Sequence, residues 1–355
     1  MKAKTMEDKM RKIEFHNRER EKKEIMNLLN TEPTLITFIY GPINSGKTEL
    51  INNLIKDLPE SYKVFYINLR GRFIRDYDEF IKVLFDVEHE ERYGRIKEFL
   101  KPIVRVLPES YYGIPIPKDI FLGLFKEKEI EDAFVYIETV LRAFYKNGSL
   151  PVLVIDELQV IGDLKVDDLL IYKLFNFFVR LTKELHLAHV FVITSDSLFI
   201  EKVYREAMLQ ERCRYLQVDD FDEETTTAFL EGHGFTDDEK TMAWEYCGGK
   251  PVCLVELINT EDNREGKAKE LLKIRKGQIE EVVYSLEVKD KKMFDAVMGV
   301  LSEFIGKEKI RYKYLSDEIK FLVRKNIIFA DSVNKELKPQ SMLNLLAIRE
   351  VMKNV

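Results

Sequence analysis

The stretch TLITFIYGPINSGKTEL, residues 34–50, carries the strongest structural signal in this 355-residue chain. Residues 34–40 are an apolar run rich in β-branched and aromatic side chains, and the length of the run suits a buried parallel strand. Residues 41–48 have the pattern G-x-x-x-x-G-K-[S/T], and a helix is expected to follow as far as about Leu58. A strand, a glycine-rich turn and a helix in this order predict a loop that binds phosphate groups.

Each part of this Walker A pattern has a physical role. Gly41 and Gly46 permit backbone angles that turn successive N–H groups toward phosphate oxygens, and the positive end of the following helix strengthens that field. Lys47 would place its charge on the β- and γ-phosphates, and the Thr48 hydroxyl is a hard ligand for Mg²⁺. The predicted nucleotide-binding residues of the loop are Gly41, Pro42, Ile43, Asn44, Ser45, Gly46, Lys47, Thr48 and Glu49.

A second buried strand is expected at LPVLVID, residues 150–156, and two acidic residues stand at its end. Asp156 would hold Mg²⁺ through water, together with Thr48, and Glu157 would polarise the attacking water as a general base. Two acidic residues after a strand can also simply begin a helix. Their combination with the Walker A pattern favours a Walker B site, with Lys47 and Glu157 as catalytic residues for hydrolysis.

Three further apolar runs complete a predicted parallel sheet, at residues 63–69, 189–195 and 214–220. Helical patterns separate the runs, as right-handed βαβ crossovers require, so the fold class is α/β. The run at 189–195 ends in Thr194-Ser195-Asp196, where a polar side chain can sense the γ-phosphate. Ser195 is the first choice for this role, and a helix N-cap is the alternative for both Ser195 and Asp196.

The composition excludes several classes of protein. With 45% hydrophobic and 33% charged residues, the chain is typical of a globular protein rather than a disordered one. Its apolar runs are far shorter than the ~20 residues of a membrane helix, its charged N-terminus lacks a secretory signal, and its net charge of −6 argues against a protein that coats nucleic acid. We therefore expect a cytoplasmic protein without membrane contact, with Cys213, Cys247 and Cys253 as reduced thiols.

The chain divides into three predicted regions. Residues 1–220 would form the α/β core, opened by a helix that Asn17 caps, with a helical insertion at about 70–148 that lacks strand runs. Residues 221–285 would form a helical lid. Residues 286–355 contain fourteen basic and ten acidic residues, and their order of helix, helix and short strand suggests a winged helix-turn-helix domain.

Taken together, the motifs resemble the archaeal ATPases of the STAND class, which are P-loop relatives of AAA+ proteins and of origin-recognition initiators. The resemblance rests on the Walker A and B motifs, the polar tip of the fourth strand, an FxNRExE opening from Phe15, and the Gly248-Gly249-Lys250-Pro251 turn. It spans about residues 13–350. It implies a five-stranded sheet of order 5-1-4-3-2, a helical lid, a winged-helix domain, and slow, switch-like hydrolysis of ATP with Mg²⁺.

The resemblance also implies roles for residues outside the Walker motifs. Asn17 and Arg18 match the opening motif that flanks the nucleotide base. The GGKP turn, with Pro251, matches the lid motif that closes over the nucleotide, and a plain helix C-cap is the alternative for its two glycines.

An arginine before the fifth strand is a further feature of the family, where it supplies charge to a γ-phosphate. Arg212 is the first choice for this catalytic role, with Arg214 and Arg205 as alternatives. Such a finger acts across a subunit contact, so the pattern is compatible with oligomerisation, but a solvated surface arginine is the simpler interpretation.

The sequence thus predicts a Mg²⁺-dependent ATPase that works as a nucleotide-driven conformational switch for an unknown protein client. One alternative is a DNA-binding, initiator-like or mobile-element-associated ATPase, in which basic residues such as Arg324 and Lys325 contact duplex DNA. Another is a nucleotide-gated protein scaffold that does not hydrolyse ATP. A small-molecule kinase is disfavoured, because Glu157 and the C-terminal regions would have no role in it.

Overall fold

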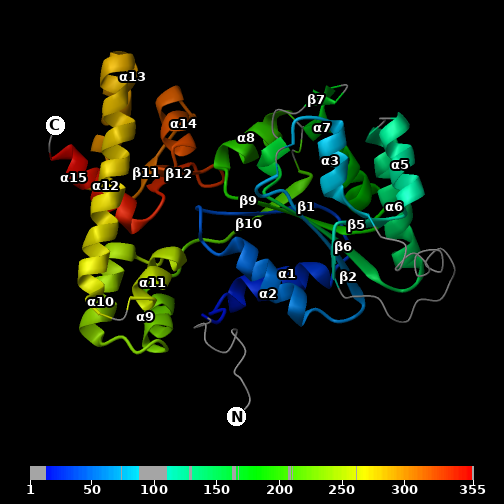
Figure 1. Ribbon diagram of the computed structural model, residues 1–355, viewed down its shortest axis with the longest axis horizontal. Helices are drawn as coiled ribbons and strands as arrows, with labels where there is room; N and C mark the ends of the chain where they lie inside the picture. The colour runs from blue at the N-terminus through cyan, green and yellow to red at the C-terminus, as the bar shows by residue number, and fades with distance from the viewer. Residues whose placement is uncertain are drawn as a thin grey trace, which may run out of the picture.

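A computed structural model describes residues 13–72, 74–87, 110–127, 130–161, 165–166, 168–206, 209, 211–260 and 262–353. Residues 1–12, and residues 88–109 of the predicted helical insertion, lie outside these ranges. A parallel six-stranded sheet forms the centre of the N-terminal part, in the order β10-β1-β9-β6-β2-β4 (Figure 1). Its strands are β1 (Ile36–Tyr40), β2 (Tyr62–Asn68), β4 (Ser110–Tyr112), β6 (Leu150–Asp156), β9 (His189–Thr194) and β10 (Cys213–Gln217).

The sheet has six strands instead of the five that the sequence predicts, so its full order differs from 5-1-4-3-2. The additional strand, β4, pairs in parallel with β2 at the edge of the sheet, where Tyr111 lies opposite Phe65. It belongs to the insertion that was expected to be helical, as do β3 (Phe85–Val87) and β5 (Ile114–Ile116), which pair with each other. Periodicity misses these strands because each has only three residues.

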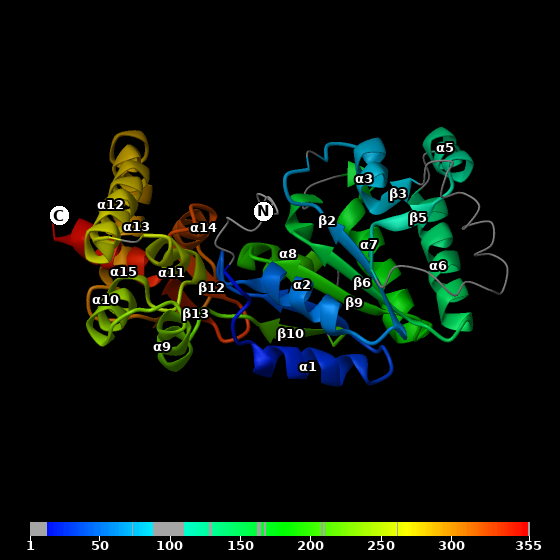
Figure 2. The same ribbon diagram turned by 60° about the horizontal axis from the view of Figure 1, so that its bottom comes forward.

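Helices cover both faces of the sheet, as the continuous apolar strands predict (Figure 2). One face packs on α1 (Glu19–Leu29) and α2 (Lys47–Asp57). The other face packs on α3 (Tyr77–Leu84), α6 (Ile130–Lys146), α7 (Leu170–Val179) and α8 (Ser197–Glu206). The remaining short elements of this part are α5 (Lys118–Glu127), β7 (Lys165–Val166), β8 (Asp168–Leu169), a 3-10 turn at Leu158–Ile161 and a π-helical turn at Arg180–Glu184.

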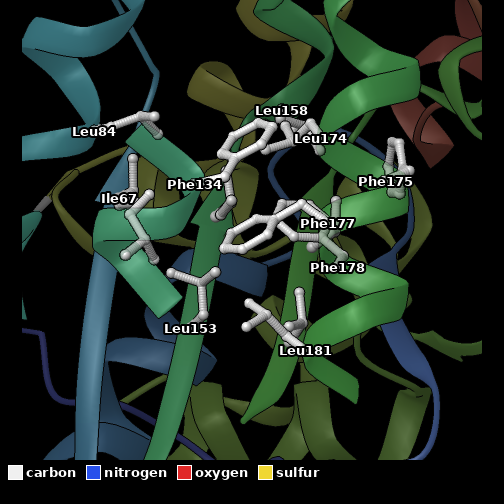
Figure 3. Close-up of a cluster of buried hydrophobic side chains, with 14 of the residues drawn as sticks. Ile67, Leu84, Phe134, Leu153, Leu158, Leu174, Phe175, Phe177, Phe178 and Leu181 are labelled. Carbon is white, nitrogen blue, oxygen red and sulfur yellow. The ribbon is translucent and has the colours of Figure 1, made fainter. Parts of the chain in front are cut away.

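An aromatic pair joins two helices over the second face of the sheet. The rings of Phe134 on α6 and Phe177 on α7 stack with their centroids 4.5 Å apart, beside Leu153 of β6 (Figure 3). Burial of each such side chain stabilises the fold by roughly 1.5–3 kcal/mol. This packing holds β6 in place and with it Asp156, the last residue of the strand.

A helical region follows β10, with its own apolar core around Phe229 and Leu254. It consists of α9 (Glu223–Glu231), α10 (Asp237–Cys247) and α11 (Pro251–Ile258). A disulfide joins Cys247 to Cys253, which corrects the expectation that all three cysteines are reduced; Cys213 is a free thiol. The turn between α10 and α11 brings the two Cα atoms to 5.7 Å, a normal separation for a disulfide.

The C-terminal region combines helices with a small antiparallel sheet of order β11-β13-β12. Its elements are α12 (Arg264–Lys289), α13 (Lys291–Ser302), β11 (Ile310–Arg311), α14 (Asp317–Arg324), β12 (Ile328–Asp331), β13 (Glu336–Pro339) and α15 (Met342–Met352). The long α12 runs without a break through residues 285 and 286, and its buried Ile279 and Val283 belong to the C-terminal core. None of the helices in the described ranges has the length and apolarity that a transmembrane span needs.

Candidate nucleotide-binding and hydrolysis site

The loop between β1 and α2 is held against the end of β10. A Cβ atom on Gly41 would lie 2.0 Å from the carbonyl oxygen of Val218, so this close approach requires glycine. The Ser45 hydroxyl donates to the same carbonyl at 2.7 Å. Gly46, with φ +90°, precedes the first turn of α2. The loop therefore has the shape that the Walker A pattern predicts.

Lys47 is folded back onto its own loop. Its Nζ donates to the carbonyl oxygens of Gly41 and Pro42, at 3.1 and 2.7 Å. Burial and, second to it, the nearby charge of Lys250 lower the pKa of this ammonium to about 7, against the opposing effect of Glu157 and Asp156. A phosphate in the loop would give the lysine a stronger partner than these carbonyls.

Asp156 lies at the carboxyl end of β6 and is fully buried. Its Oδ2 accepts hydrogen bonds from the Thr48 hydroxyl and the Tyr66 hydroxyl, both at 2.8 Å. Its Oδ1 has no partner among the described residues. Burial raises the pKa of this carboxyl, while the two hydroxyl donors oppose the rise. A buried carboxylate oxygen without a donor, beside a threonine hydroxyl, fits the hard oxygen ligands of Mg²⁺ or of its bound water.

Both carboxylate oxygens of Glu157 are occupied. Arg70 contacts Oε1 at 2.6 Å, and the Gln159 amide donates to Oε2. The backbone of Glu157 has φ +61°, an uncommon value for a residue other than glycine, and its N–H donates to the carbonyl of Ile193. The predicted base therefore lies beside Asp156, just after the carboxyl end of β6. Its carboxylate is held between the Arg70 guanidinium and the Gln159 amide.

The tip of β9 differs from the expectation in its detail. The buried Thr194, rather than Ser195, enters the network around Glu157, because its hydroxyl donates to Gln159 at 2.8 Å. Asp196 accepts from the N–H groups of Leu198 and Phe199, so it caps α8, which was the alternative interpretation. Ser195 is half-buried between them.

The opening motif contacts the loop. Arg18 is buried and donates to the carbonyl oxygens of Ser45 and Asp219, both at 2.7 Å, and its guanidinium lies 4.7 Å from the ring centre of Phe221. Asn17 does not cap α1 as predicted: the residue before the helix is Arg18, with φ 76° and no side-chain cap. The Asn17 amide donates instead to the Thr225 hydroxyl on α9, at 2.7 Å.

The turn between α10 and α11 also reaches the loop. The buried Lys250 donates to the carbonyl of Ile43 at 2.9 Å and pairs with Asp220 at 2.8 Å. Burial lowers the pKa of Lys250 and raises that of Asp220, while their mutual attraction opposes both shifts. Pro251 is the first residue of α11. This turn therefore approaches the loop through its lysine.

The C-terminal region also contacts the loop and the residues around it. Gln340, which follows β13, accepts a hydrogen bond from the N–H of Ile43 at 3.1 Å. Tyr40 donates to Asp331 of β12 at 3.3 Å, and Lys338 of β13 pairs with Asp219. An N–H group that could bind phosphate is thus occupied by a side chain of the same protein.

A cavity of about 590 Å³ lies between the core, the helical region and the C-terminal region, and its wall includes Arg18, which contacts Ser45 of the loop. The wall also includes Phe221, Trp244 and Gly248. Asn17 and Gly249 also line it, whereas Pro251 does not. Aromatic rings beside polar and glycine backbone groups suit a flat heterocyclic base and a ribose.

Arg212, its alternative Arg214, and Glu49 lie outside this arrangement. The carbonyl of Arg212 accepts from the N–H of Ile36, so Arg212 lies at the amino end of β10. The loop of the same chain lies at the other end of the strands, their carboxyl end. Arg214 is at the same end, with a hydrogen bond to Thr34, and the side chain of Arg205 lies outside the description. Glu49 is exposed on the first turn of α2.

Several residues of the site were not found from the sequence. Gln159 stands two residues after Glu157, and Thr194 precedes Ser195, so both were within reach of motif-based reasoning. Tyr66, Arg70 and Gln340 belong to none of the predicted motifs. Tyr66 and Arg70 reach the site because β2 ends beside β6. Gln340 reaches it because the C-terminal region packs against the loop.

Comparison with known proteins shows the family to which the chain belongs. Residues 15–257 match the family described as an ATPase domain predominantly from Archaea. The chain belongs to this family. Residues 265–352 match the C-terminal domain of MJ1010-like ATP-binding proteins. The family members similar to this chain include a protein of Pyrococcus abyssi named as the uncharacterized ATP-binding protein PYRAB09480, 48% identical over 95% of this chain and 98% of its own length.

A second such member, MJ1659 of Methanocaldococcus jannaschii, is also named as an uncharacterized ATP-binding protein. It is 45% identical over 97% of this chain and 98% of its own length. Among solved structures, the Walker-type ATPase PABY2304 of Pyrococcus abyssi has a similar fold, with a TM-score of 0.64 at 17% identity over 94% of this chain and 96% of the other. The P-loop ATPase fold is thus shared with a structure of distant sequence.

Proposed function

We propose that this protein binds ATP at the loop of residues 41–48 and hydrolyses it to ADP and phosphate as a nucleotide-driven switch. The observation that carries the proposal is the meeting of Lys47, Thr48, Asp156 and Glu157 where the strands of the sheet end at their carboxyl ends. Family membership and the names of the relatives as ATP-binding proteins support it. Phosphates in the loop would place the base and ribose in the cavity beside Arg18.

The residues present fit Mg²⁺ as the cofactor. Thr48 and Asp156 would hold it, since the Oδ1 atom of Asp156 is buried and has no donor among the described residues. When bound, the ion would neutralise charge on the β- and γ-phosphates. Tyr66 fixes the orientation of Asp156, and Lys47 leaves the carbonyls of its loop to contact phosphate oxygens.

Glu157 would take a proton from the attacking water. In the present arrangement Arg70 and Gln159 engage both of its oxygens, so one of these contacts must open before the carboxylate can accept a proton. Thr194 and Gln159 connect the end of β9 to Glu157 through hydrogen bonds. A γ-phosphate that contacts Thr194 would therefore affect the hydrogen bond that holds Glu157. The predicted role of Ser195 stays a proposal, second to Thr194. For Arg212, only a contact with a neighbouring subunit would bring it to a phosphate.

The switch follows from the contacts around Ile43. Its N–H donates to Gln340 and its carbonyl accepts from Lys250, so two parts of the chain outside the core rest on the loop. A phosphate that takes the N–H of Ile43 would compete with Gln340. We propose that ATP binding releases the C-terminal region, with its predicted winged helix, and that hydrolysis allows it to return for the next cycle.

Phosphate release with Mg·ATP tests this function. We expect slow turnover by the wild type and a loss of at least about 100-fold in Glu157→Gln, with ATP affinity retained, because a positioned base contributes roughly 10²–10⁴-fold. Glu60→Gln, an exposed glutamate after α2, is the matched control and should keep the wild-type rate. ATP binding without turnover by the wild type would contradict hydrolysis and favour the nucleotide-gated scaffold.

DNA binding is a second candidate, supported by exposed basic side chains on the C-terminal region. Lys313, Arg324 and Lys325 are all exposed on or near α14. If they contact DNA phosphates, duplex affinity should fall with rising salt and decline further in an Arg324→Ala/Lys325→Ala variant. Affinity for a 20–30 base-pair duplex (about two to three helical turns) that is the same in this variant and in the wild type would reject this role.

A further inference from the structure

The turn that joins α10 to α11 is the point at which the helical region touches the phosphate-binding loop. Phe221 donates its N–H to the carbonyl of Gly249 at 2.9 Å, and a Cβ atom on Gly249 would lie 1.7 Å from the carbonyl oxygen of Phe221. The next residue, Lys250, contacts Ile43 and Asp220. The conformation of this turn therefore decides whether the wall of the cavity and the Lys250 contact exist.

A covalent bond closes this turn. Cys247 is the last residue of α10 and Cys253 lies in the first turn of α11, so the disulfide joins the two sides of the Gly248-Gly249-Lys250-Pro251 segment. Both sulfur-bearing residues are buried, with relative exposures of 0% and 4%, and Cys247 lines the cavity. The bond thus lies inside the fold, and one of its two cysteines belongs to the cavity wall.

We propose that Cys247 and Cys253 form a redox-sensitive site that sets the affinity of the cavity for nucleotide. A dithiol reductant would attack one sulfur, break the S–S bond through a mixed disulfide, and leave two thiols on the protein while the reductant becomes a disulfide. The oxidised chain has the tighter nucleotide site, and the reduced chain has the weaker one. This inference rests on the proposed function, because it takes nucleotide as the occupant of the cavity.

The physical cause is the freedom of the two glycines. Without the disulfide, hydrogen bonds and packing alone hold Gly248, with φ +54°, and Gly249 in place, and glycine regains more conformational freedom than any other residue. If the reduced turn has the binding-competent shape about one-fifth of the time, the apparent Kd rises about fivefold, because the affinity falls by the fraction that is competent.

The coupling must act in both directions. If reduction raises the Kd for nucleotide about fivefold, bound nucleotide stabilises the disulfide by the same factor, which lowers its reduction potential by about 20 mV for a two-electron couple. Nucleotide should also slow the reduction itself, because Cys247 faces the cavity that the nucleotide would fill. This reciprocal shift distinguishes a coupled site from a bond that merely stabilises the fold.

The experiment uses the full chain in a Cys213→Ser background, so that only this pair can react. Cys213 lies on β10, outside the cavity wall, which makes the substitution a suitable background. Mass measurement after alkylation without reductant should show the pair oxidised. The Kd of a fluorescent ATP analogue is then measured in the oxidised chain, in the dithiol-reduced chain, and in Cys247→Ala/Cys253→Ala. We expect the second and third values to agree and to exceed the first about fivefold.

Three outcomes are informative. Equal affinities in the oxidised and reduced chains, or free thiols in the unreduced protein, would overturn the inference while the proposed function stands. No binding in any form of the chain would instead reject the proposed function. If the double alanine variant fails to fold, the reduced chain and the shift in potential with nucleotide still test the inference, since neither needs a substitution in the turn.

Discussion

The side-chain oxygen of Gln340 lies 3.1 Å from the backbone nitrogen of Ile43 and accepts its hydrogen bond. These residues are almost 300 positions apart, and the contact connects the end of β13 to the phosphate-binding loop. Together with the Lys338–Asp219 ion pair and the Tyr40–Asp331 hydrogen bond, it places the C-terminal region where bound nucleotide would affect it. The relation between these two residues is the physical basis of the proposed switch.

Removal of the Gln340 side chain should strengthen nucleotide binding. In Gln340→Ala the N–H of Ile43 loses its internal acceptor and is left for a phosphate oxygen. Because a hydrogen bond contributes about 0.5–1.5 kcal/mol net, the Kd for ATP should fall about two- to tenfold. Titration with a fluorescent ATP analogue measures this, with Gln278→Ala on the exposed side of α12 as the control. A weaker or unchanged affinity in Gln340→Ala would argue against competition between this side chain and nucleotide.

Nucleotide affinity should depend on pH through Lys47. In the free protein this ammonium has a pKa of about 7, lowered mainly by burial, and a bound phosphate raises it again. Binding therefore takes up a proton above neutral pH. Affinity is greatest where the lysine is already charged, below pH 7, and the Kd rises toward pH 9 by at most about tenfold per unit.

The Lys47→Arg variant is the matched control for this pH dependence. A guanidinium stays protonated throughout the range, so the dependence that remains belongs to the nucleotide and to other groups at the loop, such as Lys250. Calorimetry in buffers of different ionisation enthalpy reports proton uptake directly. Uptake that is the same in the wild type and in Lys47→Arg would show that Lys47 does not titrate on binding.

Tyr66 should affect the Mg²⁺ concentration that turnover requires. Its hydroxyl is one of two donors to Oδ2 of Asp156, and partners of metal ligands commonly affect metal affinity by 10–100-fold. We expect Tyr66→Phe to need roughly tenfold more Mg²⁺ for half-maximal turnover. Tyr62→Phe on the same strand is the control, because that hydroxyl contacts Leu29 and Asn30 instead. An identical Mg²⁺ dependence in Tyr66→Phe and Tyr62→Phe would remove Tyr66 from the site.

Arg70 should restrain the proposed base. Its guanidinium is more than half exposed and lies 2.6 Å from the mostly buried Glu157, and because solvent screens the arginine, we take the contribution of an exposed pair, about 0.2–1 kcal/mol. Arg70→Ala should therefore raise basal turnover by at most about fivefold, as Glu157 is freed to accept a proton. The rate of phosphate release is compared with that of Arg75→Ala, a similarly exposed arginine that pairs with Glu79. A slower Arg70→Ala enzyme would mean that Arg70 assists the reaction.

The place and shape of the loop were predictable from the sequence because its signal is local. Gly41, Lys47 and Thr48 stand in one short motif, and Asp156 ends an apolar strand whose observed limits match the predicted ones. In contrast, β4 has three residues and is recognisable only by its partner β2. The pairing of Cys247 with Cys253 likewise depends on how the turn between two helices folds.

Contacts between distant parts of the chain could not be predicted either, because they too depend on the packing of the folded chain. Nothing in the sequence around Gln340 distinguishes it from a surface glutamine, and its role comes from the packing of β12 and β13 against the core. Arg18 illustrates an intermediate case. The motif predicted that it flanks the nucleotide base, and the structure shows that its guanidinium donates to Ser45 and Asp219 at the cavity wall.

The most direct test of the switch is the distance between the core and the C-terminal region as nucleotide binds. Fluorophores on cysteines placed at Glu60 and Glu303, both exposed, would report it in a Cys213→Ser, Glu157→Gln chain that binds ATP without turnover. We predict that energy transfer changes when Mg·ATP binds and returns to its starting value when the nucleotide is removed, as release of Gln340 from Ile43 requires. Unchanged transfer at saturating Mg·ATP would contradict the account.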